Sequence, residues 1–146
     1  MELIRNSEIE AGLEGSGFTR VYLCGDLKMS NGVRHIPTDG YEIGISRYRE
    51  FTFEKPHIHS FNHEYNFVLE GRIKILLLRT GREILLEKGD LFVIEPDEPY
   101  VGKALPGTMT LFSKVPGGND KVLVPATPAI EGWGASWDAV YGEAAL

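Results

Sequence analysis

Turn-forming residues divide the middle of this chain into short apolar segments, and this spacing argues against long helices. The segments are rich in Ile, Val, Leu, Phe and Tyr, which favour strands. Helical periodicity is weak except at residues 6–15, where two glycines limit the helix to a short one. We therefore predict an all-β sandwich or barrel. Its expected strands are 20–24, 41–49, 64–69, 72–78, 82–87, 91–95, 109–114 and 120–124.

The length of 146 residues fits a single domain, 1–146. Its strand-rich core covers about 20–124, and a tail of different composition covers 125–146. That tail combines Pro, Gly and Ala with two tryptophans and a tyrosine. Because exposed Trp is unfavourable, we expect these aromatic side chains to pin the tail to the outside of the core or to a second subunit.

The composition excludes several kinds of partner. A net charge of -6 opposes binding to nucleic acid, whose affinity comes largely from Lys and Arg on phosphates. No apolar stretch approaches the ~20 residues that cross a bilayer, so no membrane association is expected. The acidic N-terminus lacks the apolar segment of a secretory signal. Cys24 is the single cysteine, so no intrachain disulfide can form. We expect a cytoplasmic location.

Three of the four histidines lie between residues 57 and 63, directly before Glu64. Side chains of a strand alternate between its faces, so His57 and His59 should share one face. The polar residues after them suit a turn, and a hairpin could bring Glu64 back to the two imidazoles. Two imidazoles and a carboxylate suit a divalent metal ion such as Fe, Mn, Zn or Ni. The alternative is a pair of exposed or hydrogen-bonded histidines without a metal.

This stretch resembles the first motif of the cupin family. That motif is His-x-His, three or four residues, Glu, six residues, Gly, and it is matched by His57, His59, Glu64 and Gly71. Residues 89–102, GDLFVIEPDEPYVG, resemble the looser second motif. The resemblance spans roughly residues 40–115. It implies the cupin double-stranded β-helix, a jelly-roll barrel, here with short N-terminal and C-terminal extensions.

One position departs from the family pattern. The family's last metal ligand, a histidine, would fall eleven residues after Gly89, where this chain has Tyr100. A tyrosine can bind a metal as a phenolate or hydrogen-bond a metal-bound water, but it is a poorer ligand for soft divalent ions. The predicted metal site therefore has three protein ligands, or four with an unusual oxygen donor, unless it has lost its metal.

Two further residues are candidates for binding a substrate. Asn66 shares the parity of Glu64 in its strand and should point inward, where it could hold a substrate or a water. His63 could lie at the mouth of the site, although a solvent-exposed turn histidine is the simpler interpretation. The Gly-rich residues 114–121 could cradle an anion, but a hairpin between the last two strands explains them better.

The resemblance implies a metal-dependent enzyme that acts on a small molecule, as a dioxygenase, a sugar isomerase or epimerase, or a decarboxylase. The alternative is a non-catalytic cupin that binds or senses a sugar or a carboxylate. In both cases the partner is a small-molecule ligand. We also expect a homodimer that pairs through sheet edges, since such pairing covers exposed edge strands.

Overall fold

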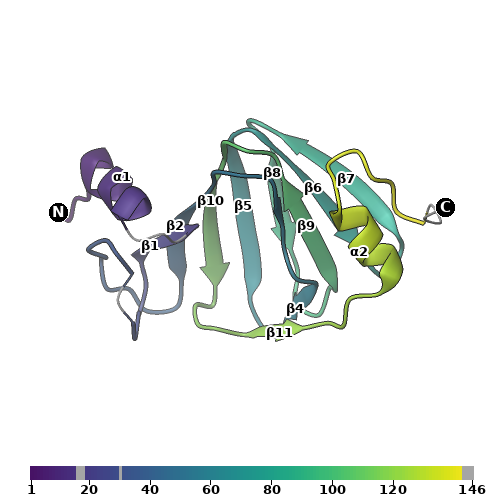
Figure 1. Ribbon diagram of the computed structural model, residues 1–146. Helices are drawn as coiled ribbons and strands as arrows, with labels where there is room; N and C mark the ends of the chain where they lie inside the picture. The colour runs from purple at the N-terminus through teal and green to yellow at the C-terminus, as the bar shows by residue number, and fades with distance from the viewer. Residues whose placement is uncertain (16–18, 30, 143–146) are drawn as a thin grey trace.

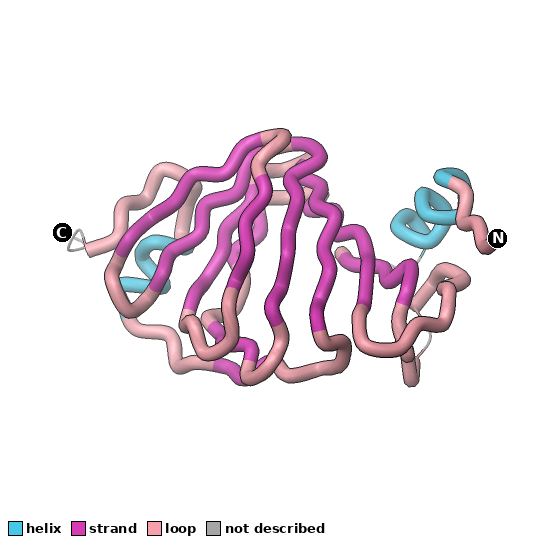
Figure 2. Tube along the Cα trace, turned by 180° about the vertical axis from the view of Figure 1, so that it is seen from behind, coloured by secondary structure: helices cyan, strands magenta, loops and turns pink. Residues whose placement is uncertain are grey.

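The computed structural model describes residues 1–15, 19–29 and 31–142, and it shows two antiparallel sheets packed face to face (Figure 1). The first sheet has the order β1 (Arg20–Cys24), β2 (Glu42–Tyr48), β10 (Thr108–Val115), β5 (His63–Glu70) and β8 (Leu91–Ile94). The second has the order β11 (Lys121–Leu123), β4 (His57–His59), β9 (Tyr100–Ala104), β6 (Arg72–Leu77) and β7 (Arg82–Glu87), with β3 (Thr52–Phe53) paired to β9. Figure 2 shows the same strands from behind.

All eight predicted strands are present, with shifts of one residue at some ends. The sequence pattern missed β9, which contains Gly102 and Lys103 and so lacks a strand-like composition. All five residues of β9 are buried, and it pairs along its length with β6. The predicted hairpin over residues 114–121 is wrong, because β10 and β11 belong to different sheets.

Two short helices cover the outer faces of the sheets, as Figure 1 shows. The helix α1 (Asn6–Gly15) packs Leu13 against Val21 and Ile45 of the first sheet. The helix α2 (Pro128–Gly134) packs against the second sheet, and its residue Trp133 is fully buried. The tail is therefore pinned to the core as predicted, although residues 143–146 lie outside the described part. In the described chain, neither helix has the length and hydrophobicity needed to cross a membrane.

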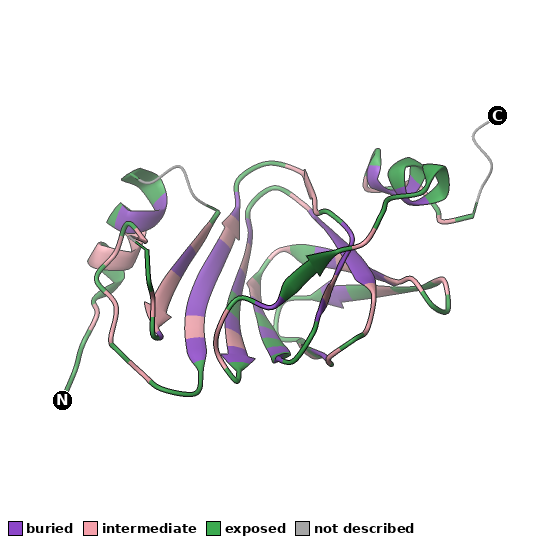
Figure 3. Cartoon of the chain, turned by 90° about the horizontal axis from the view of Figure 1, so that it is seen from below, coloured by how far each residue is buried: buried purple, intermediate pink, exposed green. Residues whose placement is uncertain are grey.

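The two-residue period of the strands directs polar side chains into the space between the sheets. On β5 the side chains of Glu64, Asn66 and Val68 are buried, whereas Tyr65 and Phe67 between them are exposed. Figure 3 shows buried and exposed stretches along the strands of the sheets. The turn after β5 requires Gly71, which has φ 82° and whose Cβ would overlap the side chain of Thr108.

Candidate functional site

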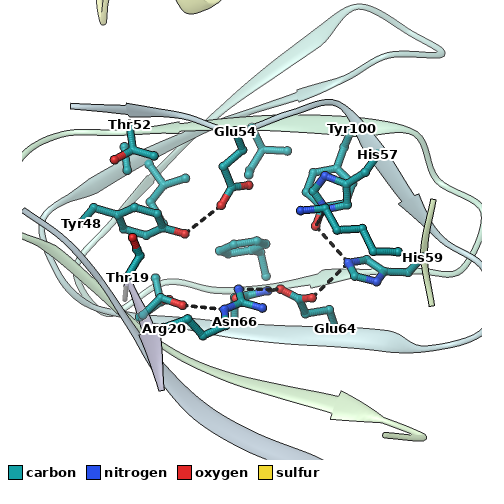
Figure 4. Close-up of a pocket in the computed structure, with 18 of the residues that line it drawn as sticks. Thr19, Arg20, Tyr48, Thr52, Glu54, His57, His59, Glu64, Asn66 and Tyr100 are labelled. Atoms are coloured by element: carbon teal, nitrogen blue, oxygen red, sulfur yellow. Dashed lines mark hydrogen bonds and ion pairs between the residues drawn. The ribbon is translucent and has the colours of Figure 1, made fainter. Parts of the chain in front are cut away.

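A cavity of about 360 Å³ lies between the two sheets and is lined by residues of both. Figure 4 shows His57, His59 and Tyr100 at one end of it and Tyr48 and Thr52 at the opposite end. In the same view Glu64, Asn66 and Arg20 run along one wall, and Glu54 enters from the other wall.

The imidazole of His57 is held in one orientation by its neighbours. Its Nδ1 donates to the backbone carbonyl of Lys55 at 2.7 Å, which leaves Nε2 as an acceptor. The hydroxyl of Tyr100 donates to that Nε2 at 2.9 Å. Burial lowers the pKa of His57, so its neutral form is favoured. The lone pair of Nε2 therefore points to the Tyr100 hydroxyl, which lines the cavity.

His59 is held in the same way by the buried carboxylate of Asp120. Its Nδ1 lies 2.7 Å from Oδ1 of Asp120, whose other oxygen accepts the backbone N–H groups of Phe61 and Asn62 at 2.9 and 2.8 Å. Burial opposes ionisation of Asp120, but the N–H of Asn62, His59 and the N–H of Phe61 together lower its pKa. Asp120 thus accepts a hydrogen bond from the Nδ1–H of His59, and this orients Nε2 of the ring toward the cavity.

Glu64 reaches the two imidazoles from the opposite sheet. The predicted hairpin between the histidine strand and the glutamate strand is wrong, since β4 and β5 lie in different sheets. The Oε2 atom of Glu64 is 3.1 Å from Nε2 of His59, yet among the described residues it has no hydrogen bond of good geometry. Burial would raise the pKa of Glu64, but Arg20 and then His59 outweigh it and hold that pKa well below its usual range.

A buried carboxylate oxygen and the Nε2 of His59 therefore face each other without a well-formed hydrogen bond. Burial lowers the pKa of His59, whereas Glu64 and Asp120 raise it, and the net shift is upward. A neutral His59 would place two lone pairs 3.1 Å apart. The arrangement is satisfied only by a positive charge at this point, either a proton on Nε2 or a cation between the two atoms.

The types of donor atom and three of their separations are compatible with a divalent metal ion. The separations are 2.9 Å from His57 Nε2 to the Tyr100 hydroxyl, 3.4 Å from that hydroxyl to His59 Nε2, and 3.1 Å onward to Glu64. Ligand atoms about 2.1 Å from one ion lie roughly 3.0–3.4 Å apart. In the described chain, however, no three His, Cys, Asp or Glu side chains alone stand ready to coordinate an ion. The fit depends on the Tyr100 oxygen as a fourth donor beside the three predicted ligands.

Of the two residues predicted to bind a substrate, only one lines the cavity. Asn66 lines the cavity and donates to Oε1 of Glu64 at 3.3 Å. His63 is exposed at the start of β5 and does not line the cavity. Burial raises the pKa of Tyr100 well above its ordinary value, so its hydroxyl is protonated in the structure as described.

Sequence reasoning missed three groups of the site. Arg20 lines the cavity from β1, and Tyr48 donates to Oε1 of Glu54 at 2.9 Å at the end away from the histidines. Asp120 lies in the Gly-rich segment that was interpreted as a hairpin. The inward parity of Arg20 with Tyr22 was a usable signal for Arg20, whereas nothing local marks Asp120 or Glu54.

No protein-family model matches this sequence, and comparison with curated proteins finds no match. Solved structures do match in fold. KdgF from Halomonas sp. has a TM-score of 0.54 at 20% identity and covers 69% of this chain and 80% of its own. The polyketide cyclase RemF from Streptomyces resistomycificus has a TM-score of 0.54 at 20% identity, with coverages of 68% and 70%. A conserved protein with a double-stranded β-helix domain from Klebsiella pneumoniae has a TM-score of 0.53 at 18% identity, with coverages of 68% and 91%.

These structures are cupin-type jelly-roll proteins, so the predicted fold is confirmed: this chain has the cupin double-stranded β-helix. At identities of 20% and below, these matches show the fold but not the activity.

Proposed function

We propose that His57, His59, Glu64 and Tyr100 hold a divalent metal ion and that the protein is a metal-dependent enzyme for a small molecule. The observation that carries this proposal is the pair of fixed imidazoles. Each has its Nδ1 bound to an oxygen acceptor. The Nε2 of His57 meets the hydroxyl of Tyr100, and the Nε2 of His59 faces the buried carboxylate of Glu64. Such acceptors behind metal-bound histidines set the tautomer and the ring orientation.

When bound, an ion in this cavity would supply Lewis acidity toward a substrate oxygen. The other residues of the cavity bind and orient. The Tyr100 oxygen belongs to the proposed donor set, and Asn66 presents an amide to the same space. At the opposite end, the pair of Tyr48 and Glu54 offers a second hydrogen-bonding group about which a substrate can be oriented. RemF, which has this fold, is a polyketide cyclase, so the fold is compatible with catalysis.

Metal content tests the proposal directly. We expect protein purified without a tag to contain nearly one divalent ion per chain by mass spectrometry. The variant His57→Ala should lose it, because even the loss of a hydrogen-bond partner behind a ligand weakens metal affinity by about 10-fold or more, and loss of the ligand itself weakens it further. The matched control is His63→Ala, which removes an exposed histidine of the same segment and should keep the metal. Equal, low metal content in all three proteins would contradict the proposal.

A second candidate is a binding module without metal, and the Tyr100 hydroxyl favours it. That hydroxyl already donates to His57 and lies 3.4 Å from His59, so these imidazole nitrogens have a hydrogen-bonding partner without an ion. In this case the cavity would hold a small molecule through hydrogen bonds alone. Ligand binding that is unchanged by a chelator in metal-loaded wild-type protein would favour this candidate.

An apolar surface on the outside of the first sheet supports the expected homodimer. Helix α1 covers the outer face over β1 and β2, and the apolar cluster beneath it extends to Leu69 of β5 and Met109 of β10. Beyond it, outward side chains on three neighbouring strands are exposed, and the pairing places Phe67 beside Leu111 and Leu91. An antiparallel sheet that faces water usually has polar residues on that face. The exposed apolar set is Tyr65, Phe67, Leu91, Val93, Leu111 and Val115.

We propose that a second copy of the chain packs on this set of six residues. Their exposed fractions amount to about 500 Å² of surface, close to the apolar share of the roughly 800 Å² that each partner buries in a standard interface. The set contains no charged residue, so the same face on a second copy is complementary to it by two-fold symmetry. The proposed contact therefore uses the face of this sheet in place of its edge.

Replacing Leu91 with lysine should convert the proposed dimer to a monomer. Leu91 is 62% exposed in the single chain, so the substitution leaves the fold intact but places a charge in the interface. Sedimentation velocity should give the mass of two chains for the wild type and of one chain for the variant. Leu85→Lys is the control, since Leu85 is 48% exposed on β7 of the other sheet and should leave the dimer unchanged. A monomeric wild type at micromolar concentration would rule out this interface.

A further inference from the structure

Arg20 presents an incompletely paired guanidinium to the cavity. Its Nε donates to Oγ of Ser46 at 3.0 Å, and its guanidinium lies 4.0 Å from the ring centre of Phe112. These two contacts hold the plane of the group. The side chain keeps 30% of its surface accessible although protein surrounds it, so the accessible part faces the cavity that it lines.

The carboxylate closest to Arg20 pairs with it only loosely. Among the described residues, Glu64 is the acid within 4.0 Å of this guanidinium, at 3.6 Å, which is beyond a good hydrogen bond. Glu64 also interacts with Asn66 and lies beside His59. The planar fork of an arginine is suited to two parallel hydrogen bonds with a carboxylate, and Glu64 does not supply them.

Lys114 places a second cation on the same side of the cavity. It lies opposite Glu64 in the pairing of β10 with β5, and its side chain is 8% exposed. Its ammonium is 3.3 Å from the hydroxyl of Tyr22 and 4.0 Å from the carboxylate of Glu42. An ammonium has three donors, and these contacts engage them incompletely.

The two cations stand at a junction between two cavities. A second cavity, of about 650 Å³, shares Arg20, Tyr22, Lys114 and Asn119 with the first. Lys121 also lines the first cavity, so cationic residues of β1, β10 and β11 share its lining with Glu54 and Glu64. Lys103 of β9 lines it too, but its ammonium donates to the carbonyl of Trp133. The second cavity is also lined by Asp26, Asp39 and Glu42, so the excess of cations belongs to the first cavity, in a chain of net charge -6.

We infer that the cavity takes a small organic carboxylate, whose carboxylate group binds between Arg20 and Lys114. The rest of such a ligand extends from this junction toward Tyr100 in the first cavity, and a longer tail can occupy the second. A carboxylate fits better than a neutral sugar, because the fork of Arg20 then gains the paired acceptors that it lacks. This inference rests on the proposed function, since it names the ligand class of the same cavity.

The test compares benzoate with its uncharged isostere benzamide by calorimetric titration and thermal shift. Both probes are used on wild-type protein with and without a chelator. We expect benzoate to bind and to raise the melting temperature, and benzamide to bind at least about tenfold more weakly. Arg20→Gln should weaken benzoate binding by at least about tenfold, because it removes charged hydrogen bonds. The control Arg82→Gln removes an exposed arginine on β7 and should bind benzoate as the wild type does.

Arg20→Lys provides a second variant that keeps the charge and the fold if Arg20→Gln is unstable. It should retain part of the benzoate affinity, since a point charge replaces the fork. Equal binding of benzoate and benzamide, or equal benzoate binding by wild type and both Arg20 variants, would overturn the inference. Tight binding of inorganic phosphate with no binding of benzoate would also overturn it.

The outcomes separate this inference from the proposed metal role. Benzoate binding that depends on Arg20 in a chain that holds no metal would reject the metal proposal and support the carboxylate site. One metal ion per chain, with no preference for benzoate over benzamide, would support the metal proposal and reject the carboxylate site.

Discussion

Replacing Asp120 with alanine is expected to weaken metal binding by about 10- to 100-fold and to lower the free energy of unfolding by about 3 kcal/mol. The carboxylate of Asp120 is buried and accepts three hydrogen bonds, from Nδ1 of His59 and from the backbone N–H groups of Phe61 and Asn62. Without it, two backbone donors lose their partners and the imidazole of His59 is free to rotate.

The two effects of Asp120 can be measured separately. Competition with a chromophoric chelator gives the metal affinity, and urea denaturation gives the free energy of unfolding. Asp120→Asn keeps the size and one acceptor oxygen, so it should recover part of the stability but little of the metal affinity. Asp26→Ala removes an exposed carboxylate that pairs with Lys28 and serves as the control. Unchanged metal affinity in a folded Asp120→Ala protein would show that this contact does not orient a metal ligand.

Replacing Lys103 with methionine is expected to lower the free energy of unfolding by about 2–3 kcal/mol and to loosen the C-terminal segment. The ammonium of Lys103 donates to the carbonyl oxygens of Trp133, Ser136 and Ala139 at 2.8, 2.9 and 3.0 Å. It also lies 4.1 Å from the ring centre of Trp133. Methionine preserves the side-chain volume but leaves these carbonyls without a charged donor.

The effect of Lys103 should depend on pH. Burial, and then the nearby charge of Lys74, lowers the pKa of Lys103 from 10.5 to about 8. Between these two values the unfolded chain holds this proton and the folded chain has released it. The free energy of unfolding of the wild type, relative to Lys103→Met, should therefore rise as the pH increases from about 8 to 10.5.

Urea denaturation across this pH range, followed by tryptophan fluorescence, measures both effects of Lys103. Lys88→Met is the control, because Lys88 is an exposed residue that pairs with Glu70 on the surface. A stability difference between wild type and Lys103→Met that does not change with pH would contradict the lowered pKa. No loss of stability at all would mean that the three carbonyl contacts do not hold the tail.

Much of the fold could be predicted because its signals are local. Short apolar runs separated by turn residues predicted eight of the strands, but not the two-residue β3 (Thr52–Phe53) or β9. The strand β9 escaped prediction because Gly102 and Lys103 are poor strand formers, and it forms because β6 and β4 pair with it from both sides. Tertiary pairing here overrides local preference.

The candidate site also has a part that local sequence predicted and a part that it did not. Alternation within one strand was sufficient to place His57 with His59 and to turn Glu64 and Asn66 inward. It could not show that Glu64 arrives from the opposite sheet.

The partners of the site residues come from distant parts of the chain. Asp120 lies 61 positions from His59, and Arg20 lies 44 positions before Glu64. The direction of a side chain follows from the geometry of its own strand, and this the sequence by itself determined. Which strands face one another depends on burial and pairing summed over the whole chain, so only the tertiary structure decided which charges meet in the cavity.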